Sequence, residues 1–280
     1  MSRTATGAIE AGIDRVDPTM HPHVVVTGAA GIIGSRVARQ IAQTLPQSLV
    51  SGIDRFSGSS AIDEFHLADL ATADLLPLLR GVDVLVHCSF NLRADAVTSQ
   101  DGRVDLAIMR RVLKAAALMG VKHVVVLSSA MVYGAWPDNP MPITEDAPVR
   151  PNPEYGFALH MASVEAVARN WQSDADGRKL TIMRPAVLVT EERRGGLSDV
   201  LASASVIRSE SGDAPAQYLH VDDLASAIAI VVGTGADGVF NIAPDSWISA
   251  DDLAALAGPK PRLHLPDPAA RLVSAIRFRL

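Results

Sequence analysis

The sequence contains a single cysteine, Cys88, among its 280 residues, so the chain can form no internal disulfide. This fits a reducing compartment best, and we expect the protein in the cytoplasm. Within "VDVLVHCSF" the cysteine follows apolar residues, which predicts a buried thiol rather than a nucleophile. The chain also lacks an apolar run near the ~18 residues that a membrane helix needs, so we expect no membrane partner.

Positive charge is also scarce. The 25 Lys and Arg residues are outnumbered by 31 Asp and Glu residues, which gives a net charge of -6, and no basic tract is present. Nucleic-acid binding requires clustered positive charge, so we expect no nucleic-acid partner. Residues 1–22 lack the apolar core of a signal peptide and are expected to form a flexible leader.

From His23 onward, short runs rich in Val, Ile and Leu alternate with amphipathic stretches of helix length. The runs are "HVVVTG", "SLVSGID", "EFHLADL", "VDVLVHCS", "VKHVVVLSS" and "KLTIMRPAVLV". Between them lie "GIIGSRVARQIAQTL", "ATADLLPLLRG", "VDLAIMRRVLKAAALMG" and "PEYGFALHMASVEAVARNWQ". This alternation predicts an α/β protein of the Rossmann type, a doubly wound parallel sheet with helices on both faces.

Three glycines spaced three residues apart, Gly28, Gly31 and Gly34, join the first predicted strand to the first helix. One glycine accepts a positive φ at the turn, one lets the backbone approach a pyrophosphate, and one lets the helix pack on the strand. Ile32 and Ile33 would begin the helix, whose exposed N–H groups favour an anion. The sequence therefore predicts that these five residues bind a dinucleotide.

Asp54 ends the second predicted strand, twenty residues after Gly34. A carboxylate at this place can take the hydroxyls of the adenosine ribose. It would repel a ribose 2′-phosphate, so the sequence favours NAD over NADP as the cofactor. Arg55 could bind that phosphate if Asp54 turned aside, which leaves NADP as the alternative.

The pattern divides the chain in two. Residues 23–185 are predicted to form the dinucleotide-binding Rossmann domain. The alternation loosens after about residue 186 and returns in "YLHVDDLASAIAIVV" and "GVFNIA". We expect residues 186–280 to form a small substrate-binding lobe, partly woven into the sheet, over the carboxyl ends of the strands where ligands bind.

Across roughly residues 23–258 the sequence resembles the extended short-chain dehydrogenase/reductase superfamily, the NAD-dependent epimerase/dehydratase group. The matching stretches are "VTGAAGIIG", "GID", "LADL", "SSAMVYG", the helix with Tyr155, "MRPAVL" and "YLHVDDLASAI". The resemblance implies an NAD-dependent oxidoreductase or epimerase acting on a small hydroxyl or keto substrate. A homodimer is also expected, because the helices at 104–119 and 154–171 carry apolar residues on more than one face.

The resemblance implies roles for four further residues. Asp69 and Leu70 would lie beside the adenine, Ser129 would hydrogen-bond the reacting oxygen, and Tyr155 would be the acid/base and touch the cofactor. Ser129 could instead simply end a strand. Two other segments would line the substrate pocket, Arg184-Pro185 and "HVDD". For Tyr133 a core position, and for Asp222 and Asp223 a helix-capping role, are the alternatives.

The chain departs from this family where a lysine should follow the tyrosine by one helical turn, because Leu159 stands there. Leucine can neither hydrogen-bond the nicotinamide ribose nor hold positive charge near Tyr155. His160 is expected to pack elsewhere, since five residues place it about 140° around the helix from Tyr155. Better candidates to replace the lysine are expected in the loop that follows the fourth predicted strand: His87, Asn91 and Arg93.

Two functions remain open on these observations. In the first, the chain is an enzyme. In the second, it is a non-catalytic dinucleotide-binding sensor or complex subunit, which the loss of the lysine favours. Sugar-nucleotide dehydration is disfavoured, because Ala130 and Met131 stand where dehydratases of this family carry Asp-Glu. The short segment between Arg184 and "HVDD" also gives little support to a large nucleotide-sugar pocket.

Overall fold

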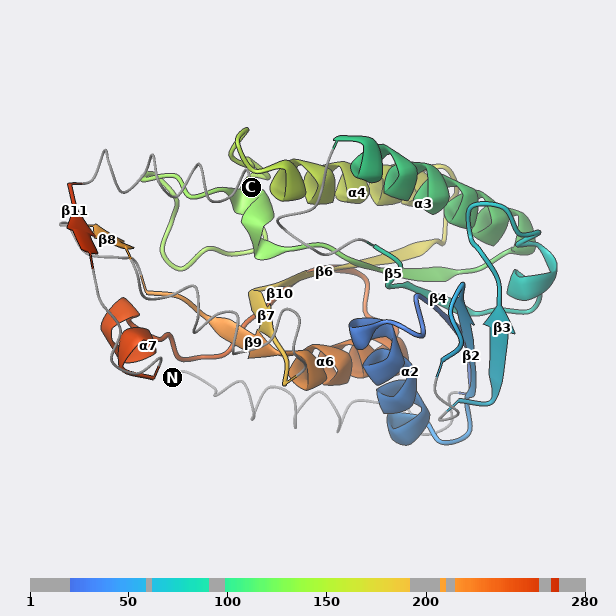
Figure 1. Ribbon diagram of the computed structural model, residues 1–280. Helices are drawn as coiled ribbons and strands as arrows, with labels where there is room; N and C mark the ends of the chain where they lie inside the picture. Colours follow the sequence, from blue (N-terminus) through green and yellow to red (C-terminus); the bar gives the residue numbers. More distant parts are fainter. Residues whose placement is uncertain are drawn as a thin grey trace.

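The computed structural model describes residues 21–58, 62–90, 99–191, 207–209, 215–256 and 263–266. At its centre lies a seven-stranded sheet in the order β10-β6-β5-β4-β1-β2-β3, with every neighbouring pair parallel (Figure 1). The strands are β1 His23–Thr27, β2 Leu49–Asp54, β3 Glu64–Leu67, β4 Val84–His87, β5 His123–Leu127, β6 Lys179–Pro185 and β10 Gly238–Ile242. The predicted Rossmann-type sheet is confirmed.

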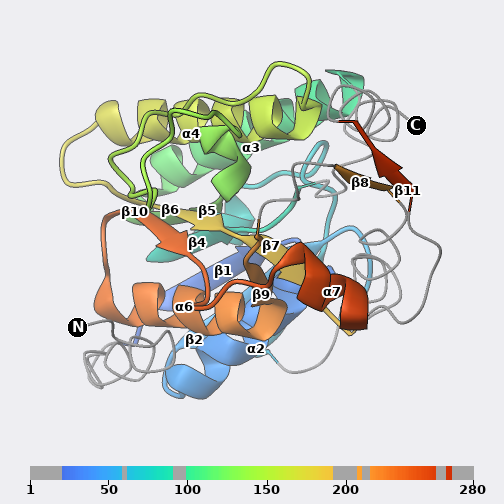
Figure 2. The same cartoon turned by 90° about the vertical axis from the view of Figure 1, so that its left-hand side faces the viewer.

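Helices cover both faces of this sheet. Figure 2 shows α3 (Ser99–Met119) and α4 (Gly156–Ser173) above it, and α2 (Ile32–Thr44) and α6 (Val221–Thr234) below it. Smaller elements are β7 (Val187–Val189) paired with β9 (Tyr218–His220), β8 (Ile207–Ser209) paired with β11 (Leu263–Leu265), and α7 (Ala250–Leu256). No described helix is long and apolar enough to cross a membrane.

The strand order reverses between β1 and β4. From β1 the chain adds β2 and β3 on one side, and β4, β5 and β6 follow on the other. In open parallel sheets, ligands bind outside the carboxyl ends of the strands at such a reversal. The loop after β1 and the residues after β4 meet at this place. The fold therefore indicates that a ligand site lies at this edge of the sheet.

The inner strands of the sheet, β1, β2, β4, β5 and β6, are buried because both of their faces carry apolar side chains. In β1, Val24 and Val26 pack into the core between the sheet and helices α2 and α6, whereas Val25 packs into the core between the sheet and helices α3 and α4. All three side chains are fully buried. Near-continuous apolar runs are what a sheet covered on both faces requires, and this explains why the strands could be found from the sequence.

The prediction of a helix over "ATADLLPLLRG" was wrong, because this segment holds only the short 3-10 helix η1 (Pro77–Leu79). Asp74 accepts a hydrogen bond from the Leu76 N–H at 3.2 Å, and Asp69 accepts one from the Ala71 N–H at 2.9 Å. Local bonds of this kind offer the backbone turns in place of a helix. Pro77 removes a further donor.

The division into a leader, a Rossmann domain and a lobe stays a prediction. The strand β10 joins the central sheet beside β6, and α6 packs on α2, so part of the segment 186–280 completes the Rossmann layers. Residues 1–20 and 267–280 lie outside the described residues.

Three buried histidines make stability depend on pH. Burial lowers the pKa of His87 to about 4, and burial with the nearby Lys179 charge lowers that of His123 to about 4, against a partial opposing effect of Asp237. Burial also lowers the pKa of His160. The unfolded chain therefore takes up protons on these histidines at a higher pH than the folded chain does. The stability contributed by neutral His87 and His123 is fully present above pH ~6.5 and is lost as the pH falls toward about 4, and the contribution of His160 is lost in the same direction.

We therefore expect the free energy of unfolding to fall on the order of 2 kcal/mol for each of His87 and His123 between pH 7.5 and pH 5. Urea titrations at the two pH values measure this loss. The double variant His87→Gln/His123→Gln should show a flatter pH dependence than wild type. An equal loss in the two proteins would contradict the assignment.

Candidate functional site

The glycine-rich loop wraps tightly between β1 and α2. Gly28 has a φ of +71°, and a Cβ there would lie 2.9 Å from the backbone of Cys88. A Cβ on Gly34 would lie 2.1 Å from the Gly28 carbonyl oxygen, so the helix rests directly on the turn. Gly31 is the N-cap of α2 and provides no side-chain cap. The first N–H groups of the helix, at Ile32 and Ile33, are therefore available to an anion.

Asp54 ties this loop to β2. Its Oδ2 accepts a hydrogen bond from the Ala30 N–H at 3.0 Å, and its Oδ1 accepts one from the Phe56 N–H at 3.0 Å. The carboxylate thus stands beside the glycine-rich loop, as the sequence predicts, and each oxygen keeps a further lone pair for a ligand hydroxyl. The exposed Arg55 stacks over Phe56, with its guanidinium carbon 4.9 Å from the ring centre.

The residues predicted beside the adenine follow the neighbouring strand β3. Asp69 is exposed, whereas Leu70 is buried in the apolar core. Cys88 directly follows β4 and is buried, which raises the pKa of its thiol to about 12. The prediction that this thiol is buried is confirmed. Asn91 and Arg93 lie outside the described residues.

The two residues predicted at the reacting oxygen lie on elements that touch. Ser129 follows β5 and is the N-cap of the 3-10 helix η2 (Ala130–Tyr133), where its Oγ accepts a hydrogen bond from the Met131 N–H at 3.2 Å. Tyr155 is the N-cap of α4, which contacts η2. Both side chains are partly exposed. This arrangement leaves the Ser129 hydroxyl free to donate to a substrate oxygen.

Leu159 does not face the sheet. The face of α4 that packs inward carries Met161, Val164 and Glu165, all nearly inaccessible, whereas Leu159 is 42% exposed. Two residues along a helix correspond to about 160° around its axis, so Leu159 lies opposite Met161. Leu159 thus lies on the exposed side of α4, which it shares with the position of Tyr155 one turn earlier.

We therefore expect Leu159→Lys to leave the dissociation constant for NAD within about twofold of wild type, as for other surface changes. Leu159→Glu is the matched control, because it places the opposite charge at the same point. Calorimetric titration of both variants measures the effect. Tighter binding with lysine and weaker binding with glutamate would show that position 159 reaches the coenzyme.

Of the other predicted substitutes for the lysine, His87 is fully buried at the end of β4. Its Nδ1 lies 2.7 Å from Thr27 Oγ1, and its ring packs edge-on against Phe90. His160 is also buried, and its Nε2 lies 3.6 Å from Asp105 Oδ2. The expectation that His160 packs away from the tyrosine is consistent with this position between α3 and α4.

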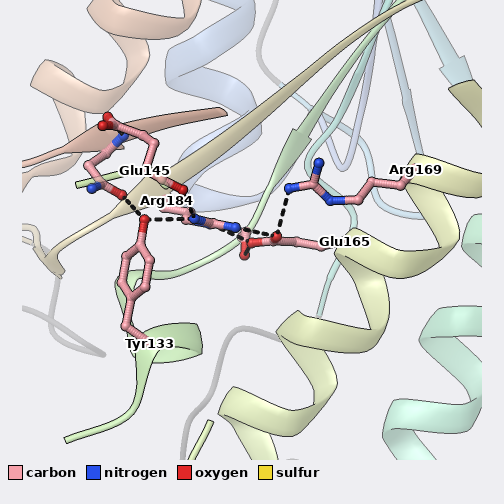
Figure 3. A network of polar contacts seen from close by, with 7 residues as sticks. Tyr133, Glu145, Glu165, Arg169 and Arg184 are labelled. Atoms are coloured by element: carbon pink, nitrogen blue, oxygen red, sulfur yellow. Dashed lines mark hydrogen bonds and ion pairs between the residues drawn. The ribbon is translucent and has the colours of Figure 1, made fainter. Parts of the chain in front are cut away.

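A buried network of charges that includes Glu165 and Arg184 was missed in the sequence (Figure 3). Arg184 on β6 donates to both carboxylate oxygens of Glu165 on α4, at 2.8 and 2.7 Å. The Ser128 hydroxyl donates to the same carboxylate at 2.6 Å, and Arg184 Nη1 donates to the Tyr133 hydroxyl at 2.6 Å. Glu165 occurs among apolar residues on the inner face of its helix, and that was the one available signal.

This network gives Arg184 a partner other than a substrate. Burial alone would lower the pKa of its guanidinium, but hydrogen bonds to Glu165 and Tyr133 and the Glu165 charge outweigh burial and raise that pKa. Tyr133 is a core residue, as its alternative interpretation held, with 3% of its surface exposed. Asp222 and Asp223 lie in the first turn of α6, where the capping interpretation places them.

The comparisons with known proteins agree with this geometry. A model described as the NAD dependent epimerase/dehydratase family matches residues 24–243. The chain belongs to this family. The resemblance seen in the sequence is confirmed, and with it the expectation of an NAD-dependent enzyme of the epimerase and dehydratase kind. The alternative of a non-catalytic sensor or subunit is not favoured.

Among curated relatives, the N-acetyl-alpha-D-glucosaminyl-diphospho-ditrans,octacis-undecaprenol 4-epimerase of Escherichia coli O157:H7 is 27% identical over 266 residues, 90% of this chain and 78% of that protein. The DesIV dTDP-glucose 4,6-dehydratase of Streptomyces venezuelae, solved with NAD bound, has a TM-score of 0.70 at 25% identity, covering 89% of this chain and 85% of that one. The UDP-Glc/GlcNAc 4-epimerase of Campylobacter jejuni has a TM-score of 0.72 at 18% identity, covering 89% and 88%. That last likeness shows the fold alone.

Proposed function

We propose that this family member is an NAD-dependent oxidoreductase or epimerase that acts on a secondary hydroxyl or keto group, with Ser129 and Tyr155 at the reacting oxygen. The observation that carries the proposal is the glycine-rich loop, in which Gly34 rests on Gly28 and Asp54 stands beside the start of α2. A side chain at Gly28 or Gly34 would collide with backbone, so this loop needs glycine at both places, and its open N–H groups at the start of α2 suit a pyrophosphate.

The residues that would hold the coenzyme fit it chemically. The N–H groups of Ile32 and Ile33 would bind the pyrophosphate, Asp54 would bind the adenosine ribose, and the exposed Asp69 would lie near the adenine. NAD supplies the oxidising nicotinamide ring when it is bound. Both Asp54 oxygens already accept backbone N–H groups, which holds the carboxylate in place and supports NAD over NADP.

Two residues of the chain would bind the reacting oxygen of the substrate and transfer its proton. Ser129 Oγ would donate a hydrogen bond to the substrate oxygen and fix its direction. As the phenolate, Tyr155 would take the proton of that oxygen during oxidation, and as the neutral phenol it would donate a proton to that oxygen during reduction. A neutral tyrosine is already the acid that reduction needs, so reduction tolerates the absence of a nearby lysine better than oxidation does.

The substrate is proposed from the chemistry of the relatives. The Escherichia coli relative is named for a sugar on a lipid diphosphate, and the Streptomyces venezuelae enzyme for a sugar on a nucleotide diphosphate. A ring carbon bearing a hydroxyl is the group these names share. We propose such a carbinol carbon as the reacting centre here, whether on a diphosphate-linked sugar or on a smaller molecule.

The test of this function is the variant Tyr155→Phe, which removes only the phenolic oxygen. We expect it to abolish turnover with UDP-glucose, dTDP-glucose and small hydroxy and keto compounds. Net oxidation or reduction is followed as nicotinamide absorbance, and epimerisation, which causes no net change in the coenzyme, is followed by chromatography of the product epimer. The calorimetric affinity of the variant for NAD should match wild type, because the pyrophosphate site lies elsewhere. Unchanged turnover would falsify the role of Tyr155, and absence of NAD binding by the wild-type chain would overturn the proposal as a whole.

We also propose a homodimer built on α3 and α4. Val104, Leu118 and Leu159 are large apolar residues that these helices expose, at 50%, 62% and 42%. Apolar side chains of this size on the outer face of a helix pair fit a partner surface. The mass in solution by light scattering tests this.

A further inference from the structure

The Glu165–Arg184 pair lies where it can act on the proposed reacting site. Glu165 and Arg184 are 2% and 1% exposed, so their charges are removed from water. A buried ion pair often adds no stability over apolar residues of the same volume, because desolvation offsets the attraction. Such a pair can instead fix the positions and orientations of the groups that its hydrogen bonds join.

The pair clamps both ends of the turn that carries Ser129. At its start, Ser128 donates its hydroxyl to Glu165 at 2.6 Å and its N–H to the Met183 carbonyl at 2.7 Å. At its end, the Tyr133 hydroxyl accepts from Arg184 at 2.6 Å and donates to Asn241 Oδ1 at 2.7 Å. The turn between these clamps holds the Ser129 hydroxyl.

The same pair fixes this turn to the helix of Tyr155. Glu165 belongs to α4, whose N-cap is Tyr155, and Arg184 belongs to β6, which lies next to β5 in the sheet. Figure 3 shows Glu165 reaching from the helix to Arg184, which in turn meets Tyr133. The strand end, the turn and the helix therefore share one carboxylate and one guanidinium.

We propose that Glu165 and Arg184, with Ser128 and Tyr133, are positioning residues for the reaction, which hold the Ser129 hydroxyl in a fixed place relative to the start of α4. The role of Ser129 itself rests on the proposed function. The clamp on the turn does not, so the two can be tested apart.

The first test separates positioning from stability. In the double variant Glu165→Leu/Arg184→Met, apolar groups of similar size replace both charges, and we expect the urea midpoint to stay near that of wild type. Amide hydrogen exchange at residues 128–134 should nevertheless become about tenfold faster, because the clamps are gone. Exchange in β1, β4 and α2 should not change.

The variant Ser128→Ala keeps the test decisive if the double variant does not fold. It removes one hydroxyl, leaves the ion pair intact, and is expected to speed exchange at residues 128–131 alone. The control is Asp138→Asn/Arg150→Gln, which removes an exposed bidentate pair with hydrogen bonds of 2.9 Å near the same edge. We expect that control to leave exchange at 128–134 unchanged.

The outcomes distinguish this inference from the proposed function. Exchange at 128–134 that stays at the wild-type rate in the double variant and in Ser128→Ala overturns the positioning role, whatever the coenzyme titration shows. The same holds if exchange rises equally throughout the sheet. Local loosening with unchanged NAD affinity supports the inference. If wild type converts any of the tested substrates, the double variant should lower kcat more than it raises KM.

Discussion

Replacing Gly34 with alanine is expected to abolish NAD binding and to destabilise the fold by more than about 3 kcal/mol. The added Cβ would lie 2.1 Å from the Gly28 carbonyl oxygen and 2.7 Å from its carbon. Both contacts are with backbone, which cannot rotate aside as a side chain can. The helix must then move off the turn, and the N–H groups proposed for the pyrophosphate move with it.

Urea titration and NAD calorimetry on Gly34→Ala measure the two effects. Ser35→Ala is the matched control, because it changes the next residue of the same helix, whose hydroxyl makes only one weak bond at 3.5 Å. That control should behave as wild type in both measurements. A Gly34→Ala variant that folds and binds NAD normally would mean that the loop is not packed as described.

Replacing Arg184 alone with methionine is expected to cost about 3 kcal/mol, because it leaves the buried Glu165 carboxylate without its bidentate partner. The remaining cation, the half-exposed Arg169, lies 3.6 Å from Glu165 Oε2 and offsets part of the loss. Tyr133 would also lose the donor to its hydroxyl. The free energy of unfolding from urea titration measures the loss. Arg150→Met is the control, since Arg150 also makes a bidentate pair, with Asp138, but at the surface.

We expect the control to leave the urea midpoint nearly unchanged, because exposed ion pairs are screened by water. The double variant with Glu165→Leu should regain most of what Arg184→Met loses. If Arg184→Met alone were as stable as wild type, and Arg184→Met/Arg169→Gln were as well, the carboxylate would have to reach water or bind a proton, and the buried pair would not exist as described.

The sequence was sufficient for the central sheet and for the glycine-rich loop. Strands buried on both faces are continuous apolar runs, and the loop needs glycine at fixed places, so both leave a direct trace in the order of residues. The segment "ATADLLPLLRG" shows where such predictions fail. Its apolar spacing is typical of a helix, but the hydrogen bonds of Asp69 and Asp74 to nearby backbone N–H groups, together with Pro77, favour turns.

The candidate site was less accessible to sequence reasoning. A motif places Leu159 one turn after Tyr155, but which side of α4 faces the sheet depends on packing with β6 and α3, which no local pattern contains. The Glu165–Arg184 pair joins residues nineteen positions apart through a helix and a strand, and only the fold brings them together. The roles of Ser129 and Tyr155 stay predictions.

The sheet also has a consequence for how the chain reaches this state. Its strands are parallel throughout, so no two of them are joined by a hairpin, and even the neighbours β2 and β3 need a crossover between them. Each pairing must close a loop before it gains any contact, which slows folding. We expect refolding from denaturant to be slow and to pass through partly paired species that aggregate at high concentration.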